Sequence, residues 1–368
     1  MINIKIGDCL EVLKTLPKNH FDTVVTSPPY YGLRDYNTGT WVGGDPNCPH
    51  KRLTKISKDT ATGHANMYDH GDVVGDAIYR QKCPICGAER QDSQIGLELT
   101  PQDYVRRLVE VFRGVRDTLK EDGTVWLNLG DTYHNYRADG LNVKQTLHKD
   151  KHDQPEVSPN RANKIQGLKE KDLMGIPWRV AFALQEDGWY LRQDIIWHKP
   201  NPMPESVKDR CTKAHEYIFL LSKSKYYYYD NEAIKEPVKQ DWGTRNRTNG
   251  KYHNSGSGLS PHSGLTKSYD RKNKRDVWSV TNKPYKQAHF AVFPPDLIEP
   301  CILAGSREGD IVLDPFMGSG TTAMVAKKHN RHYIGCELHD NYKDLIEQRV
   351  PVEEPSQVID NPLTQMLY

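Results

Sequence analysis

The feature that most constrains the fold of this chain is the repeated alternation of short apolar runs with amphipathic helical patterns. Each apolar run has the length of a strand and is followed by a turn and then by apolar residues at helical spacing. The predicted strands lie at 2–6, 22–26, 124–131, 191–198, 310–314 and 332–338, with a pair of strands around 216–230. The predicted helices lie at 9–16, 101–119, 177–185, 320–329 and up to about Arg349. This alternation predicts an α/β fold, with a doubly wound, mostly parallel sheet, helices on both faces, an antiparallel edge hairpin and inserted loops or small subdomains.

Length and composition narrow the class of protein. The chain has 368 residues, enough for one large α/β domain with insertions or for two domains. No apolar run approaches the length of a membrane span, and the N-terminus MINIKIGDCL has no signal-peptide pattern. Seven scattered cysteines fit free thiols or a metal site better than a disulfide framework. We therefore expect a cytoplasmic protein with no membrane contact.

Three stretches do not fit the sheet pattern. Residues 41–95 contain cysteines, histidines and glycines, residues 134–172 are polar, and residues 231–288 are basic and rich in Gly, Ser and Asn. The net charge of the chain is only +2, but residues 223–290 hold 14 Lys or Arg and 6 Asp or Glu. Such an excess is expected of a surface that meets phosphates, and it is equally expected of a solvated basic loop. Charge alone leaves both readings open.

Residues 312–322, VLDPFMGSGTT, form a second kind of signal. An apolar strand ends at Asp314, and Gly318 and Gly320 then open a helix whose free amides favour an anionic group. After the next strand, Glu337 lies where a carboxylate can accept from the two hydroxyls of a ribose. Neither the dinucleotide pattern nor the triphosphate-binding P-loop is present. The unit therefore indicates a nucleoside joined to a small charged group, with a tight turn made for packing as the alternative.

The stretch TSPPY at 26–30 follows the strand at 22–26 directly. Two consecutive prolines fix φ and remove backbone donors, so this loop is rigid and rich in carbonyl acceptors. Taken alone, it could equally be a structural turn.

TSPPY and DPFMGSGTT together resemble the amino-methylating DNA methyltransferases that use S-adenosylmethionine. The order of the two motifs is similar to that of the circularly permuted β group of this family. The resemblance covers residues 2–33, 97–131, 175–229 and 289–350. It implies a Rossmann-like methyltransferase fold, in which the strand before SPPY lies beside the strand before DPF.

The resemblance also implies a set of cofactor contacts. Glu337 would bind the ribose hydroxyls, and Asp8, with Cys9 beside it, would accept from the adenine amino group. Asp8 also fits the N-cap of the helix that follows, and one carboxylate can do both. Phe293, Pro294 and Leu297 would contact the methionine end. The turn around the amino-acid end would consist of Asp314, Phe316, Gly318, Ser319, Gly320 and Thr321.

The catalytic residues implied are Ser27, Pro28, Pro29 and Tyr30. An exocyclic amino group is a poor nucleophile, and fixed acceptors aimed at its hydrogens would stabilise the charge that forms on methyl transfer. Tyr30 would stack on a base flipped out of double-stranded DNA. Ser at position 27 favours N4 of cytosine. Adenine N6, an RNA or protein substrate, and a catalytically idle DNA-binding protein remain alternatives.

The cysteines of the first insertion predict a structural Zn²⁺ site. Cys83 and Cys86 form a C-x-x-C-G turn, and Cys48 and His50 supply a C-x-H half. His64 and His70 are possible substitutes for the fourth ligand, and free surface thiols are the competing interpretation.

The chain is accordingly divided into a discontinuous catalytic core (1–40, 96–230 and 289–350), a zinc-knuckle-like insertion (41–95), a target-recognition region (231–288) and a tail (351–368). Trp242, Tyr252 and Trp278 either stack on bases or pack. A restriction endonuclease as partner, and a monomer or a homodimer, are both left open. Candidate DNA contacts are Arg245, Arg247, Arg271, Lys272, Lys274 and Arg275.

Overall fold

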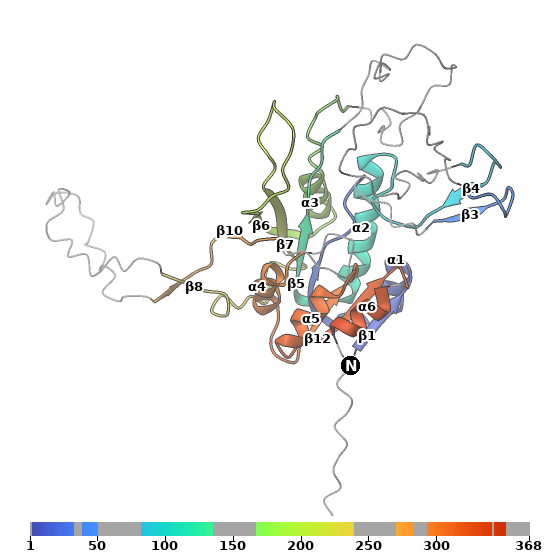
Figure 1. Cartoon of the computed structure of the whole chain (residues 1–368). Coiled ribbons are helices and arrows are strands. Elements are labelled where there is room, and N and C mark those ends of the chain that lie inside the picture. The colour runs from blue at the N-terminus through green and yellow to red at the C-terminus, as the bar shows by residue number, and fades with distance from the viewer. Residues whose placement is uncertain are drawn as a thin grey trace, which may run out of the picture. The chain divides into compact units, whose positions relative to one another are not determined.

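The computed structural model describes residues 2–32, 39–50, 82–134, 167–238, 270–282, 293–340 and 342–350. The chain forms two compact units (Figure 1). The first unit contains Met1–Pro28, Glu110–Gly130 and Ala181–Tyr368, and the second contains Pro29–Val109 and Asp131–Val180. The chain passes from the first unit to the second inside the TSPPY stretch, between Pro28 and Pro29.

The first unit contains an 8-stranded sheet with the strand order β1-β12-β11-β2-β5-β7-β6-β10. The first five strands in this order, β1, β12, β11, β2 and β5, run parallel to one another. β7 runs antiparallel to both of its neighbours, and β10 runs parallel to β6. The predicted α/β fold with a mostly parallel sheet is confirmed. The bounds are β1 (Ile2–Ile6), β12 (His332–Glu337), β11 (Ile311–Asp314), β2 (Phe21–Thr26), β5 (Leu119–Leu129), β7 (His215–Ser222), β6 (Tyr190–His198) and β10 (Val277–Ser279).

The helices of the first unit are α1 (Cys9–Thr15), α4 (Pro295–Gly305), α5 (Thr321–Lys328) and α6 (Tyr342–Arg349). The helices α2 (Pro101–Thr118) and α3 (Ile176–Glu186) contribute residues to both units. All six residues of β2 are buried, and because successive side chains of a strand point to opposite faces, both faces of the sheet are covered there. A core cluster joins Leu297 and Ile302 of α4 and Val325 of α5 to Trp126 and Val312 of the sheet.

Two predictions about the sheet need correction. The strand pair predicted around 216–230 is a single strand, β7, and residues 223–230 form turns and coil. Since β7 is already paired with β5 on one side and β6 on the other, it has no free edge for a further strand. The expected edge hairpin is β6–β7, but it does not lie at the edge, because β10 pairs with β6 outside it. Three residues of the stretch 231–288 therefore belong to the sheet.

Short antiparallel pairs complete the described structure. In the second unit, β3 (Thr40–Val42) pairs with β4 (Glu89–Gln91), and in the first, β8 (Glu236–Pro237) pairs with β9 (Arg271–Lys272). No helix within the described residues is long and apolar enough to cross a membrane.

Candidate active site

Four neighbouring strand ends bring the predicted motif residues to one edge of the sheet in the first unit. Asp8 follows β1, Glu337 ends β12, Asp314 ends β11 and Ser27 follows β2, in the order in which these parallel strands lie side by side. The registers place Ile6 beside Glu337, and Asp314 beside Gly335. β2 lies beside β11, as the family resemblance implied. Open parallel sheets bind their ligands at this carboxyl edge, where the direction of the connections changes.

Asp314 is only 1% exposed and uses its carboxylate within the protein. Its Oδ1 accepts from the Thr26 hydroxyl at 2.6 Å and from the Phe316 amide at 3.0 Å, and its Oδ2 accepts from the Thr322 hydroxyl at 2.6 Å. Burial raises the pKa of Asp314 to about 6, against the lowering effect of these three donors. Asp314 therefore ties the end of β2 to the start of α5, and acts as a positioning residue.

Glu337 fixes the glycine-rich turn from the neighbouring strand. Its Oε2 accepts from the Gly318 amide at 2.8 Å and its Oε1 from the His339 amide at 2.9 Å. Burial raises the pKa of Glu337 to about 7, while both amides oppose that rise. A carboxylate held in this way at a strand end presents its remaining lone pairs along the carboxyl edge.

The turn between β11 and α5 has the backbone that its glycines allow. Gly318 and Gly320 have φ of 52° and 78°, in the left-handed region. Gly320 is the N-cap of α5 and has no side chain, so no N-cap side chain accepts from the first backbone amides of the helix. The Thr321 hydroxyl is buried and has no hydrogen-bond partner among the residues that the structure describes. An unpaired buried hydroxyl beside uncapped amides fits a polar, anionic ligand group.

Two of the turn residues point inward. Ser319 is 3% exposed, and its hydroxyl accepts from the Arg349 guanidinium at 2.7 Å. Phe316 is half-buried. Arg349 of α6 thus holds the turn by a hydrogen bond, and the Ser319 hydroxyl already has a partner within the protein.

The other expected cofactor residues lie in the same unit. The Asp8 side chain accepts from the Leu10 amide at 2.8 Å, so the predicted N-cap of α1 is confirmed. Cys9 is 8% exposed at the start of the helix. Phe293 packs partly buried against the core cluster, whereas Leu297 is fully buried within it. Leu297 therefore serves the core, and Phe293 keeps exposed surface.

Contacts within the second unit fix Pro29 and Tyr30, the end of the TSPPY loop. Ser27 is half-buried and Pro28 is buried at the end of β2. The Pro29 carbonyl accepts from the Tyr104 hydroxyl at 2.9 Å, and a Cβ on Gly96 would lie 2.9 Å from the Tyr30 carbonyl oxygen. Tyr30 is half-buried. The loop is therefore rigid on both sides of the two prolines, and one of its carbonyls is committed to that rigidity.

Sequence reasoning missed three polar residues at this edge. Thr26 and Thr322 hold Asp314, and Asn128, which is 3% exposed near the end of β5, donates to the Tyr217 carbonyl at 3.0 Å. Thr26 is the first residue of TSPPY and Thr322 the last of DPFMGSGTT, but nothing in either motif indicated that their hydroxyls bind Asp314. Asn128 lies in an apolar run, where a single buried amide is the available signal.

The second unit brings the four predicted metal ligands together. The ligand atoms of Cys48, His50, Cys83 and Cys86 all lie within 4.8 Å of one another. Cys48 Sγ lies 3.7 Å from Cys83 Sγ, and Cys86 Sγ lies 3.5 Å from His50 Nδ1. A tetrahedral ion with metal–sulfur bonds of about 2.3 Å holds two thiolates roughly 3.8 Å apart, so this donor set fits one. The alternative ligands His64 and His70 lie outside the described residues.

The framework around this cluster is small. The β3–β4 pair flanks it, and the Gly87 amide donates to the Cys83 carbonyl at 2.8 Å in the turn between the two later cysteines. The His50 ring stacks on Trp41, with centroids 4.4 Å apart. The apolar cluster here contains only Cys48, Cys83 and Ala88 as buried members. Such a core is too small to hold the fold without a further staple.

The candidate DNA contacts fall into two groups. Arg245, Arg247, Trp242 and Tyr252 lie outside the described residues. Of the others, Arg271 donates to the Lys235 carbonyl, and Lys272 and Arg275 both pair with Glu236. Lys274 lies 4.9 Å from the Trp278 ring centroid, and Trp278 itself is only 6% exposed, so it packs.

Comparison with known proteins places these features in context. The sequence matches the model of the N6/N4 methyltransferases, described as DNA methylase, over residues 21–348. It is 40% identical to the Type II methyltransferase M.SmaI of Serratia marcescens, covering 94% of this chain and 90% of that protein. It is also 40% identical to the Type II methyltransferase M.Cfr9I of Citrobacter freundii, covering 95% and 87%. Among solved structures, the PvuII DNA methyltransferase (cytosine-N4-specific) aligns with a TM-score of 0.54 and 17% identity, covering 96% of this chain and 87% of that one.

Proposed function

The chain belongs to the N6/N4 DNA methylase family, and from that premise we propose that it transfers a methyl group from S-adenosylmethionine to N4 of cytosine in double-stranded DNA. The observation that carries the proposal is the adjacency of β2 and β11. It brings Ser27, at the start of a proline-locked loop, to the same sheet edge as the glycine-rich turn and Glu337. An acceptor loop and a nucleoside site are the two halves that amino-group methylation requires.

The cofactor supplies an electrophilic methyl group on a sulfonium centre. The proposed residues of this chain bind it by its polar ends: Glu337 accepts from the ribose hydroxyls, and Asp8 accepts from the adenine amino group. The uncapped amides at the start of α5 and the Thr321 hydroxyl suit the charged amino-acid end. Asp314 and Ser319 are proposed to position this site rather than to bind the cofactor, because their polar atoms form hydrogen bonds within the protein.

On the acceptor side, the Ser27 hydroxyl and the Pro28 carbonyl are the proposed hydrogen-bond acceptors for the target amino group. The Pro29 carbonyl already accepts from the Tyr104 hydroxyl, which leaves it one lone pair at most. Acceptors fixed in advance localise the nitrogen lone pair and stabilise the positive charge that develops there. Tyr30 stacks on the base, which must leave the duplex to reach the edge of the sheet.

The choice of cytosine depends on Ser27, since SPP in this position accompanies cytosine in the family resemblance. The PvuII DNA methyltransferase, which shares the fold, is cytosine-N4-specific. The Type II names of the relatives are the reason to propose a partner endonuclease.

The regions outside the sheet have separate proposed roles. Residues 41–95 form a subdomain stapled by Zn²⁺ through Cys48, His50, Cys83 and Cys86. Residues 231–288 recognise the target sequence, with Arg271, Lys272 and Arg275 near its described end. There Glu236 pairs with Lys272 and Arg275, so DNA phosphates would compete with this carboxylate for the two cations.

The test is methyl transfer from labelled S-adenosylmethionine to unmethylated DNA, followed by nucleoside analysis of the product. N4-methylcytosine is the expected product. N6-methyladenine would overturn the base assignment, and no incorporation into varied DNA would refute the proposal as a whole.

A further inference from the structure

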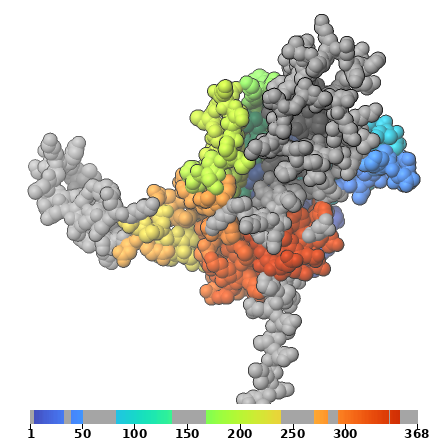
Figure 2. All heavy atoms as spheres, in the orientation of Figure 1, coloured from blue at the N-terminus to red at the C-terminus, as the bar shows by residue number. Residues whose placement is uncertain are grey.

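The connection between β6 and β7, residues 199–214, leaves the sheet at its carboxyl edge. β7 starts where β5 ends, with Tyr217 opposite Leu129, and His198 at the end of β6 pairs with His215. The loop therefore starts from the same edge as Ser27. In Figure 1 it extends well beyond the ends of β6 and β7, and in Figure 2 its yellow-green atoms project from the surface. Three strand spacings of roughly 4.8 Å separate β2 from β6, about 14 Å, which is comparable to the ~12 Å width of the DNA major groove.

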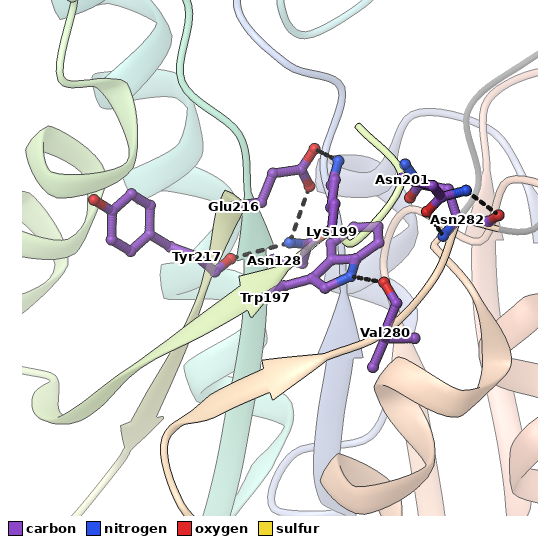
Figure 3. Close-up of polar contacts among 8 residues, drawn as sticks. All are labelled: Asn128, Trp197, Lys199, Asn201, Glu216, Tyr217, Val280 and Asn282. Atoms are coloured by element: carbon purple, nitrogen blue, oxygen red, sulfur yellow. Dashed lines mark hydrogen bonds and ion pairs between the residues drawn. The ribbon is translucent and has the colours of Figure 1, made fainter. Parts of the chain in front are cut away.

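The base of this loop is fixed by a buried polar network (Figure 3). The Lys199 ammonium pairs with Glu216, and both side chains are less than one fifth exposed. The other oxygen of Glu216 accepts from the Asn128 amide at 3.4 Å, and the Lys199 amide donates to the Ala214 carbonyl at 2.8 Å. Lys199 Nζ also lies 4.1 Å from the Trp197 ring centroid. A partly buried pair with this many partners holds the first residue of the loop in place.

A second contact joins Asn201, in the first part of the loop, to the segment that follows β10. The Asn201 side chain donates to the Asn282 carbonyl at 3.2 Å and accepts from the Asn282 amide at 3.0 Å. The Trp197 indole donates to the Val280 carbonyl at 2.9 Å, and Figure 3 shows both contacts beside each other. This reciprocal pair mimics a strand ladder beyond the end of the sheet.

The far side of the loop is closed by Glu205. Its carboxylate accepts from Arg210 Nη1 at 2.6 Å and from the Lys213 amide at 3.1 Å. The loop is therefore fixed at Lys199, at Asn201 and, through Glu205, between its two halves.

Met203 lies between these anchors in the sequence of the loop. It is 81% exposed, more than any other large apolar side chain in the described residues. Pro202 and Pro204 flank it, and their fixed φ angles restrict the backbone on both sides. The loop also holds Lys199, Lys208, Arg210 and Lys213 against two acids, Glu205 and Asp209. A rigid, solvent-exposed methionine on a cationic loop is costly in water and suits a polyanion with an apolar interior.

We propose that Met203 is a wedge that enters the base stack of duplex DNA and fills the gap left by the flipped target base. Apolar side chains, Met and Pro among them, serve this purpose in proteins that unstack DNA. Lys208, which is exposed on the same loop, meets a phosphate beside the wedge, and the braced backbone keeps the wedge from folding away. The proposal rests on the proposed function, since it needs a base that leaves the duplex beside Ser27.

The experiment first maps the site that the wild-type chain methylates, and then uses two short duplexes that contain it. In one the target base is paired, and in the other it faces an abasic position, so that no pairing energy opposes flipping. Met203→Ala should lower kcat/KM on the paired duplex by about tenfold or more, as expected when the cost of unstacking is no longer repaid. On the abasic duplex it should stay within about threefold of wild type. Met203→Leu keeps the apolar volume and should retain activity on both duplexes.

Val207→Ala is the matched control, because Val207 is also an exposed apolar side chain of this loop, at 40%. It should behave as wild type on both duplexes. Wild-type rates for Met203→Ala on paired DNA, or an equal loss on both duplexes, would overturn the wedge. A shift of Met203→Ala from dimer to monomer in sedimentation would instead assign the side chain to contact with a second copy. If the wild-type chain methylates no DNA at all, the proposed function fails, and the wedge fails with it.

Discussion

At the scale of single residues, the carboxylates of this edge differ in what they can offer a ligand. Asp314 is buried and has three protein donors, whereas Glu337 is only partly buried and has two amides. Position along a motif does not separate the two, because both are acids at the ends of adjacent strands. Burial and hydrogen bonding do separate them, and they are the reason to propose Asp314 as a scaffold residue and Glu337 as the ligand-binding one.

Glu337 gives a pH dependence whose sign can be worked out. Burial raises its pKa to about 7, so the free protein carries a neutral carboxyl below that pH. Because ribose hydroxyls bind the ionised form, affinity for S-adenosylmethionine should fall as the pH drops below about 7, by up to about tenfold per unit. Titration calorimetry between about pH 5.5 and 7 measures it.

Two variants make this test specific to Glu337. Glu337→Gln should bind the cofactor more weakly and with a clearly smaller slope over that range, the remainder being due to Asp314, whose pKa is raised by burial to about 6. His339→Gln removes the neighbouring imidazole and should keep the slope, since the His339 backbone amide that donates to Glu337 is retained. A slope that persists undiminished in Glu337→Gln would show that another group titrates.

Tyr30 carries a different kind of prediction. Its proposed role is stacking on the target base, so Tyr30→Ala should reduce methyl transfer by at least about a hundredfold, since stacking and orientation are both lost. Cofactor affinity should remain near wild type, because none of the proposed cofactor contacts lies in TSPPY. Tyr30→Phe keeps the ring and is the matched control. Parallel loss of transfer and cofactor binding in Tyr30→Ala would exclude a role confined to the base.

At the scale of elements, the turn between β11 and α5 depends on how closely α6 packs against it. Gly320 has φ of 78°, and a Cβ there would lie 2.9 Å from Ile346 Cγ2. Gly309, in another turn, has φ of 82° and no atom within 4 Å of such a Cβ. The two positions share the backbone conformation and differ only in crowding.

This pair allows backbone strain and crowding to be separated. Gly309→Ala should lower the free energy of unfolding by about 1–2 kcal/mol, the cost of a left-handed alanine. Gly320→Ala should add about 1–3 kcal/mol for overpacking against α6. Urea denaturation of both variants measures the difference. Equal destabilisation would mean that α6 moves aside at no cost.

The accuracy of prediction from sequence also differs between elements. The strand before each motif and the helix at 101–119 were predicted within a few residues, because apolar periodicity reports burial on both faces of a central strand or one face of a helix. The strand predicted within 223–230 was wrong, since aromatic content favours strands but cannot show that β7 has no free edge. β10 was missed because three residues in a basic stretch have no period to detect.

The candidate site shows the same division. Ser27, Asp314 and Gly318 were recognisable because they occupy fixed places in two motifs at strand ends, and Glu337 because it ends the next strand after the second motif. The network of Asn128, Lys199 and Glu216 was not, because its members come from three strand ends brought together only by the pairing of β5, β7 and β6. Spacing along the chain does not contain that information.

At the scale of the whole molecule, the described part of the β3–β4 region of the second unit has few buried apolar residues besides its Cys/His cluster. With Zn²⁺ as the proposed staple, purified protein should hold one zinc per chain by elemental analysis. Cys83→Ser should lose the metal and lower the melting temperature by several degrees, because metal binding contributes directly to folding. Cys211→Ser alters an exposed cysteine of the first unit and should keep both. Zinc-free wild-type protein of unchanged stability would remove the metal from the proposal.

The pairing of β1 with β12 also bears on how the molecule is made. Ile2 lies opposite Tyr333, and β2 lies beside β11. The first strands to be synthesised therefore pair with strands that are synthesised near the end of the chain. A ribosome adds roughly 5–20 residues per second, which leaves the early strands without these neighbours for on the order of tens of seconds. During that interval the serine loop exists without its cofactor turn. We therefore expect no methyl transfer by nascent chains until β11 and β12 have left the ribosome and paired with β2 and β1.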